Sequence, residues 1–162
     1  MPDVVVPVVI RDLTVADLDV LQWSGSSSHL RSVREYLERV GEGEIEYLVA
    51  AAVSDLPVGK VLIDYALDPV AGSIGQAAVL PALQSCGIGS LLVAQAEAHI
   101  RRRGRPYVKL SVEHDNPRAK ALYERLGYVA YGDAPDEWDA EDATGTIVRY
   151  QTMCTLMRKQ LA

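Results

Sequence analysis

The chain has 162 residues, of which 49% are hydrophobic and 23% are charged, proportions that are typical of a globular domain and exclude a disordered or fibrous chain. Its 22 acidic side chains outnumber its 16 lysines and arginines, and the resulting net charge of -6 argues against a nucleic-acid-binding protein. We expect a single domain over residues 1–162, because the length suits one core and no repeat or linker interrupts it.

In chain order, hydrophobic periodicity and turn residues predict strands and helices that alternate irregularly. The pattern predicts a strand over residues 4–11, helices over 14–23 and 30–40, strands over 46–54, 58–67 and 74–80, a helix over 87–103, a strand over 107–112, a helix that opens at 116 and closes at 127, and strands over 128–131 and 146–157. This order predicts an α/β (α+β) fold with a mixed, mostly antiparallel sheet of about seven strands flanked by about four helices.

Cysteine usage and hydropathy bear on where the protein works. Two cysteines, Cys86 and Cys154, are too few for a disulfide framework, which favours a reducing cytoplasm. The longest clean apolar run, Tyr47 to Val53, is far shorter than the roughly 20 residues of a membrane span. The valine-rich segment near the amino end carries Asp3 and is interrupted by Pro7, so we interpret it as a strand and not as a signal peptide. We therefore expect a cytoplasmic protein with no membrane partner.

A glycine-containing turn, Gln-Ser-Cys-Gly-Ile-Gly at residues 84–89, precedes the most regular predicted helix. The first amides of a helix lack intrahelical partners, and the helix dipole adds partial positive charge there. Gly87 and Gly89 would let phosphate oxygens approach the main chain closely, so the turn is a candidate pyrophosphate site. A plain strand-to-helix turn is the alternative. The third glycine of a dinucleotide fingerprint and the Lys of a Walker loop are both missing.

Three segments, taken in order and spacing, resemble the GNAT acyl-CoA N-acetyltransferases over residues 74–131. Residues 84–89 resemble that family's [QR]-x-x-G-x-[GA] loop, and Val79-Leu80-Pro81 resembles the end of its fourth strand. The downstream segment resembles the family's N-x-x-A…L-Y-x-x-x-G-[FY] pattern: Asn116-Pro117-Arg118-Ala119, then Leu122-Tyr123-Glu124-Arg125-Leu126-Gly127-Tyr128.

The resemblance implies the GNAT fold, in which the fourth and fifth strands splay apart and admit the pantetheine arm of acetyl-CoA. It implies that main-chain groups near Val79 pair with that arm and that Asn116 lies near the arm or its thiol end. Arg118 or Lys120 is a candidate for the 3′-phosphate. The pyrophosphate would meet the loop amides, those of Gln84, Ser85, Cys86, Gly87, Ile88, Gly89 and Ser90. Acetyl-CoA is thus the expected co-substrate, and no metal is expected.

The resemblance also assigns Tyr123 as the general acid. When an amine displaces CoA, a thiolate leaves, and a phenol with a reference pKa of about 10 can hydrogen-bond that sulfur and protonate it. The alternative is a tyrosine that only packs in the core.

The general base is where the chain departs from the family pattern. Many relatives carry a carboxylate on the fourth strand, but residues 74–79 contain none, and Ser111 occupies the alternative position on the fifth strand. Glu113 is the nearest remaining acid, and strand alternation places it on the same side as Ser111. A water relay from Gln76 or main-chain carbonyls, or an amine that arrives neutral, is the alternative.

An acidic segment over residues 133–142 is predicted to be a loop between the last two strands. It contains Asp133, Asp136, Glu137, Asp139, Glu141 and Asp142. The family resemblance places this connection on the acceptor side, where clustered carboxylates would concentrate cationic amines. A solvated, mobile loop is the alternative.

The leading hypothesis is an acetyl-CoA-dependent N-acetyltransferase in which a primary amine attacks the thioester directly in a ternary complex. The acceptor would be a small-molecule amine or a protein amine, and a homodimer is possible because dimers are common among similar folds. The missing carboxylate on the fourth strand keeps a second hypothesis open, a non-catalytic acyl-CoA-binding regulatory or sensor domain. A third is a protein-interaction domain with a phosphate-like turn.

Overall fold

The computed structural model describes residues 2–161, which form seven strands, three α-helices and five short 3₁₀ helices. The strands are β1 (Val9–Asp12), β2 (Ile45–Ala51), β3 (Pro57–Asp64), β4 (Ala71–Val79), β5 (Tyr107–Glu113), β6 (Val129–Glu141) and β7 (Ile147–Gln160). The helices are α1 (Ser27–Arg39), α2 (Ile88–Arg102) and α3 (Pro117–Arg125), with 3₁₀ helices η1 (Val15–Val20), η2 (Gln22–Ser24), η3 (Val40–Glu42), η4 (Val53–Asp55) and η5 (Pro81–Leu83).

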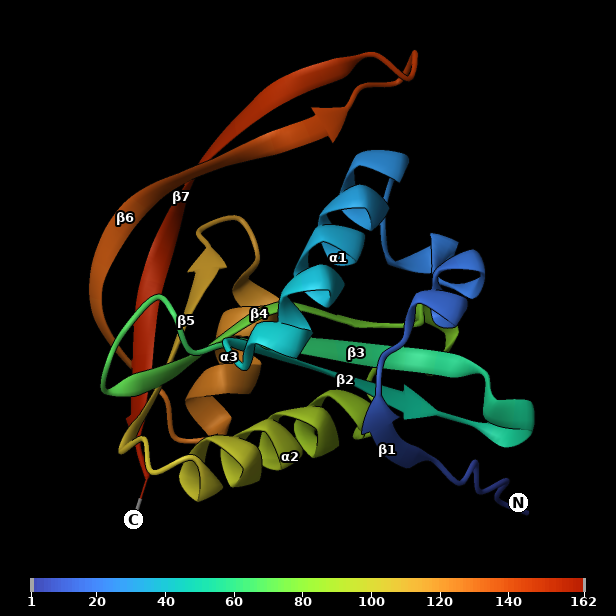
Figure 1. Cartoon of the computed structure of the whole chain (residues 1–162), viewed down its shortest axis with the longest axis horizontal. Helices are drawn as coiled ribbons and strands as arrows, with labels where there is room; N and C mark the ends of the chain where they lie inside the picture. The colour runs from blue at the N-terminus through green and yellow to red at the C-terminus, as the bar shows by residue number, and fades with distance from the viewer. Residues whose placement is uncertain (1, 162) are drawn as a thin grey trace.

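The strands form one sheet in the order β1-β2-β3-β4-β5-β7-β6 (Figure 1). The β4–β5 pair is parallel, and the other neighbouring pairs are antiparallel. The prediction of a mixed, mostly antiparallel seven-stranded sheet is therefore confirmed. The parallel pair is possible because α2 connects its two strands as a crossover helix.

Two apolar layers cover opposite faces of the sheet. On one face, an apolar stripe of α2 packs on the central strands, with Leu92, Ala96 and Ile100 fully buried or nearly so. On the other face, Val33 of α1 and residues of η1 pack on β2 and β3. Figure 1 shows α1 and α2 on these opposite sides. The sheet is thus held from both faces at its centre, which fixes the position of β4.

The first strand is shorter than predicted, and the first helix has 3₁₀ and not α geometry. The first strand begins at Val9 and not at residue 4, because Val9 pairs with Ala51, the last residue of β2, and earlier residues have no strand beside them. The helix predicted over 14–23 is two 3₁₀ helices, and Thr14 and Asp17 form a capping box at the start of the first.

The predicted acidic loop over residues 133–142 is wrong: most of it is strand. Cross-strand partners run without a gap from Asp133 and Thr155 to Glu141 and Ile147, so β6 and β7 form a long ribbon, residues 129–160, with a turn near Gly145. Side-chain pairs across the two strands support it. The rings of Trp138 and Tyr150 have centroids 4.9 Å apart.

A lysine of β3 is buried beside β4. Lys60 of β3 has no exposed surface, and its Nζ donates to the carbonyl oxygen of Gln76 at 2.8 Å and to the hydroxyl of Tyr47 at 3.1 Å. Within residues 2–161 no carboxylate forms an ion pair with it. Burial lowers the pKa of Lys60 to about 7, because the charged form loses its hydration.

This burial predicts a specific pH dependence of stability. Between pH 7 and the ordinary lysine value of 10.5, the unfolded chain binds a proton at Lys60 that the folded protein does not. Stability should therefore rise with pH in this window, by up to about 1.4 kcal/mol per pH unit, and fall as the pH drops towards 7. In Lys60→Met this slope should be absent. Denaturant unfolding at several pH values between 7 and 10 measures it.

The control is Lys120→Met, which removes a lysine whose side chain is 45% exposed. Identical pH slopes in wild type and Lys60→Met would contradict the prediction. The Met variant also leaves two hydrogen-bond acceptors without their donor, which changes the stability at every pH. The comparison therefore uses the slope of stability against pH and not its absolute value.

Candidate active site

A slot opens where β4 leaves β5. The two strands pair over only three positions, Ala71–Ser73 against Tyr107–Lys109. The β3–β4 register shifts between Lys60 and Leu62, and Gln76 has a φ of +48°, so β4 carries a bulge at this point. Beyond the bulge β4 pairs with β3 but not with β5. The predicted separation of the fourth and fifth strands is therefore present.

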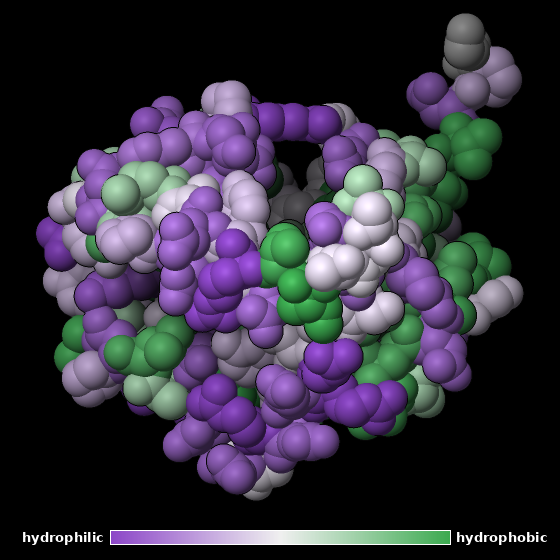
Figure 2. Space-filling view, turned by 90° about the horizontal axis from the view of Figure 1, so that it is seen from above, coloured by the Kyte–Doolittle hydropathy of each residue, from purple (hydrophilic) through white to green (hydrophobic). Residues whose placement is uncertain are grey.

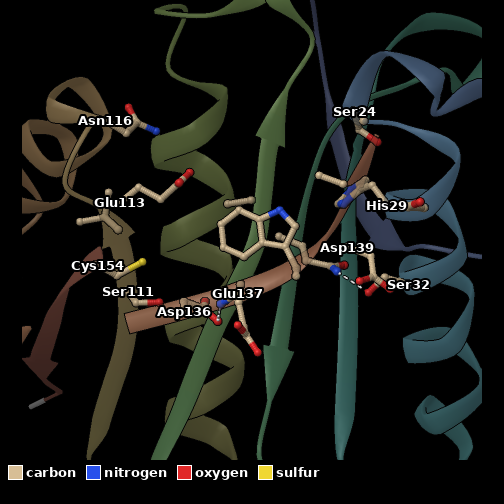
Figure 3. A pocket seen from close by; sticks show the side chains of 18 of the residues that line it. Ser24, His29, Ser32, Ser111, Glu113, Asn116, Asp136, Glu137, Asp139 and Cys154 are labelled. Atoms are coloured by element: carbon tan, nitrogen blue, oxygen red, sulfur yellow. Dashed lines mark hydrogen bonds between the residues drawn. The ribbon is translucent and has the colours of Figure 1, made fainter. Parts of the chain in front are cut away.

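A cavity of about 970 Å³ lies at this separation, lined by β4, β5, α1, α3 and the ribbon. In Figure 3, Ser111, Glu113, Asn116 and Cys154 lie on one side, and Ser24, His29 and Ser32 lie on the other. The charged residues of its wall are five carboxylates and two guanidinium groups, those of Glu35, Glu113, Asp136, Glu137, Asp139, Arg31 and Arg149. The cavity is therefore acidic. Figure 2, viewed from above, shows a mostly hydrophilic face.

The candidate phosphate loop, residues 84–90, follows β4 and leads into α2. Gly87 caps the helix with a φ of +90°, and a Cβ built on it would meet nothing within 4 Å. Gln84, Ser85 and Cys86 are exposed, and Ile88 is buried in the core. The start of α2 therefore carries an exposed loop with room beside Gly87, next to a buried anchor. The first amides of a helix lack intrahelical partners, so such a loop suits a phosphate.

A cation lies against this loop. The Arg118 guanidinium donates to Oε1 of Gln84 at 3.3 Å and to the hydroxyl of Ser85. Lys120 instead forms an ion pair with Glu124 of its own helix at 3.6 Å. Of the two candidates from the sequence, the structure brings Arg118 to the loop.

Tyr123 and Asn116 lie at the α3 wall of the cavity. Asn116 caps α3, since its side chain accepts a hydrogen bond from the Ala119 amide at 3.2 Å, as its sequence position predicts. Tyr123 packs edge-on against Tyr128 with ring centroids 5.7 Å apart. Burial raises the pKa of Tyr123, so the phenol is protonated at neutral pH and its proton is available to a leaving group.

Glu113 lies in the cavity wall at the end of β5. Its Oε1 accepts a hydrogen bond from the hydroxyl of Tyr150 at 2.8 Å, and within the described residues its Oε2 has no hydrogen-bond partner. Ser111 also lines the cavity, and along β5 Leu110 and Val112 are buried whereas Ser111 and Glu113 are not, which fits the alternation argument. No local pattern pointed to Tyr150, because it lies 37 residues from Glu113 in the chain.

Gln76 is already engaged on both sides of its amide. Its Oε1 accepts from the Tyr47 hydroxyl at 2.7 Å, and its Nε2 donates to Oγ of Ser32 at 3.0 Å. With Lys60 on its carbonyl, the residue is held rigidly between the core and the cavity wall. Sequence analysis missed the Lys60 and Tyr47 part of this network, since a Lys on a β-strand gives no sign that it faces inward.

The carboxylates of the cavity wall differ in whether a cationic side chain pairs with them. Arg149 contacts Glu137 at 3.2 Å and Asp139 at 3.1 Å. Asp136 and Glu35 line the cavity, and neither forms an ion pair within the described part of the chain. Asp136 also lines an adjoining cavity of about 420 Å³. Asp136 and Glu35 are therefore the carboxylates available to a cationic ligand.

Two further observations concern other kinds of site. Among residues 2–161, no three His, Cys, Asp or Glu side chains form a group that could hold a metal ion. In the same range, no helix is long and apolar enough to cross a membrane.

The structure thus combines a separation of two parallel strands with a glycine-capped loop at the start of the following helix. Comparison with known families agrees with the resemblance found in the sequence. The model of the acetyltransferase (GNAT) family matches residues 13–128, and the chain belongs to this family. The predicted family and enzyme class, an acyltransferase, are therefore confirmed.

Solved structures share the fold across nearly the whole chain. The ribosomal-protein-S18-alanine N-acetyltransferase from Escherichia coli has 17% identity and a TM-score of 0.74, covering 96% of this chain and 95% of its own. Ard1 from Thermoplasma volcanium has 18% identity and a TM-score of 0.74, covering 96% and 98%. The spermidine N-acetyltransferase from Vibrio cholerae, in complex with CoA and spermine, has 19% identity and a TM-score of 0.69, covering 94% and 95%. At these identities the likeness shows the GNAT fold.

Proposed function

We propose that this acetyltransferase transfers the acetyl group of acetyl-CoA to a cationic primary amine by direct attack in a ternary complex. The observation that carries the proposal is the acidic cavity at the β4–β5 separation, whose wall contains Tyr123, Glu113 and the ribbon carboxylates together. A non-catalytic acyl-CoA sensor would need no acidic wall for an acceptor amine. Release of free thiol from acetyl-CoA with a panel of amines tests the choice, and acetyl-CoA binding with no thiol release would favour the sensor.

The residues present fit acetyl-CoA. The open amides at the start of α2 suit the pyrophosphate, and the unpaired edge of β4 near Val79 suits the pantetheine amides as an added strand. Arg118 supplies a cation beside the loop for a phosphate, and Asn116 lines the cavity wall further along. The loop contacts would come from the main chain, so the thiol of Cys86 need not take part.

The chemistry follows from the charges that develop. The amine nitrogen forms a bond to the thioester carbonyl carbon, and the carbon–sulfur bond breaks with its electron pair on sulfur. Main-chain N–H groups near Val79 would stabilise the carbonyl oxygen as it gains charge. Tyr123 would protonate the leaving thiolate, because burial keeps its phenol protonated.

The amine must lose a proton before it attacks, and Glu113 is the proposed acceptor. Its Oε1 is occupied by Tyr150, whereas Oε2 has no partner among residues 2–161 and is free to take the proton. Gln76, the alternative relay, has both ends of its amide engaged. The free carboxylate therefore replaces the missing acid of β4.

The acceptor is proposed to be cationic because Asp136 and Glu35 line the cavity and form no ion pair with any residue from 2 to 161. Carboxylates without cationic partners attract ammonium groups over the distance set by ionic screening, about 10 Å at 0.1 M salt. The similar spermidine N-acetyltransferase structure, which contains spermine, gives one example of this fold with a polycationic amine.

Gly87→Asp should weaken acetyl-CoA binding. The φ of +90° disfavours any side chain, and the added carboxylate would repel the pyrophosphate, although the site has room for a Cβ. We expect a loss of affinity of at least about 2 kcal/mol, the size of a charge-assisted hydrogen bond lost. Calorimetric titration with CoA measures it, and Gly41→Asp, whose Cβ also meets nothing, is the control. Equal CoA affinity in the folded Gly87 variant would refute the loop assignment.

Tyr123→Phe should leave CoA affinity unchanged and lower kcat. Phe keeps the packing against Tyr128 and removes only the proton donor. A general acid is typically worth about 10²–10⁴-fold in rate. Single-turnover thiol release gives the rate of the chemical step, and Tyr65→Phe, far from the cavity, controls for loss of a phenol. A rate within a few-fold of wild type would return Tyr123 to a packing role.

Asp136→Asn should raise the KM for the amine by about threefold or more and leave the KM for acetyl-CoA unchanged. It should also reduce the dependence of the amine KM on salt, because one attracting charge is gone. Asp19→Asn removes an equal charge from an exposed position outside the cavity and serves as the control. If both variants behave alike, the cavity charge does not select the amine.

A further inference from the structure

Two side-chain contacts attach the ribbon to the end of β5, one from each ribbon strand. The Tyr150 hydroxyl on β7 donates to Oε1 of Glu113 at 2.8 Å. Nε2 of His114 lies 2.7 Å from Oδ1 of Asp133 on β6. These contacts lie where β5 stops pairing with β7, at Glu113 and Cys154. Beyond this point β7 has β6 as its strand partner, so the contacts set where the outer ribbon leaves the sheet.

The same part of the ribbon forms the acceptor wall. The Tyr150 ring packs on Trp138 with centroids 4.9 Å apart, and the neighbours of Trp138, Glu137 and Asp139, line the cavity with it. Arg149, next to Tyr150, holds both of those carboxylates. A displacement of this segment would therefore move the acceptor wall and the hydroxyl that holds Glu113 together.

We propose that Tyr150 is a positioning residue for Glu113. Its hydrogen bond couples the carboxylate that removes the acceptor's proton to the ribbon wall that contacts the acceptor. The inference rests on the proposed role of Glu113. With Oε1 held by Tyr150, the ammonium proton passes to Oε2, the nitrogen keeps the electron pair, and this pair forms the new bond to the acetyl carbon. The nitrogen, now bonded to the acetyl carbon, releases a second proton, which replaces through solvent the proton that Tyr123 gave to sulfur. The protonated Glu113 returns its proton to solvent.

The physical basis is selective stabilisation of the ionised carboxylate. A neutral phenol that donates to a carboxylate oxygen favours the charged form over the protonated form. The reverse effect is present in the partner, because the bond to Glu113 raises the pKa of Tyr150 and keeps it a donor. Tyr150 should therefore extend the active pH range of the enzyme downward.

Other groups near Glu113 also affect its charge and must stay constant in the test. They are His114 and Asp115 in the turn after β5, Cys154 on β7, Asp136 on β6 and Tyr123 on α3. A Tyr150→Phe substitution leaves all of them in place and keeps an aromatic ring against Trp138.

The experiment compares pH profiles of kcat/KM for one amine in wild type, Tyr150→Phe, Glu113→Gln and the double variant. Thiol release at saturating acetyl-CoA is the readout. We expect kcat/KM of Tyr150→Phe to fall by about threefold to tenfold, and most on the acidic limb of the profile, because Oε1 of Glu113 loses the hydrogen bond that holds it. In the Glu113→Gln background, adding Tyr150→Phe should change the profile no further.

Tyr65→Phe is the matched control, because Tyr65 donates to a carboxylate oxygen of Glu46 at 3.1 Å outside the cavity. Its profile should overlay the wild type. An unchanged acidic limb in Tyr150→Phe, or an equal effect of that substitution with and without Glu113, would overturn the proposal. Wild-type activity in Glu113→Gln would also overturn it, but acetyl transfer itself would stand, because thiol release would persist.

Discussion

The separation of β4 from β5 is the constraint on which the rest of the molecule depends. Parallel strands ordinarily pair along their full length, and here pairing stops after three positions because β4 bulges at Gln76. A residue other than glycine at a φ of +48° is costly unless its surroundings hold it. Lys60, Tyr47 and Ser32 hold it by binding its carbonyl oxygen and both ends of its side-chain amide. The open strand edge that would receive a pantetheine arm is thus maintained by a buried polar network.

That network carries a cost in stability. A lysine with no exposed surface, and with no carboxylate partner among residues 2–161, gives up its hydration, and the depressed pKa records this loss. A nonpolar residue would pack at the same place without that loss, but it could not donate to the carbonyl that the bulge leaves without a strand partner. The lysine therefore serves the shape of the slot at the expense of folding free energy, as strained and polar features near functional sites commonly do.

The ribbon brings a second property to the slot, its charge. β6 and β7 extend well past the end of β5 and carry carboxylates to the cavity wall. Arg149 offsets two of these charges, which leaves Asp136 as the ribbon carboxylate in the cavity wall without an ion pair in the described chain. The fold thus places a cation, Arg118, against the phosphate loop and an acidic wall in the cavity. This polarity suits an anionic donor and a cationic acceptor that meet between them.

Local sequence patterns were enough to predict the elements whose residues lie close together in the chain. The capped helices at Gly87 and Asn116, the apolar stripe of α2 and the phosphate loop follow from residues a few positions apart, and so could be predicted. The family resemblance added the strand separation and the place of Tyr123. Contacts between distant residues could not be predicted in this way. They are the burial of Lys60, the hydrogen bond from Tyr150 to Glu113, and the strand conformation of residues 133–141. In that last segment, acidic side chains and Pro135 disfavour a strand unless β7 pairs with them. Local pattern cannot reveal these, because a strand, a buried charge and a hydrogen bond each depend on a partner that folding brings from elsewhere in the chain.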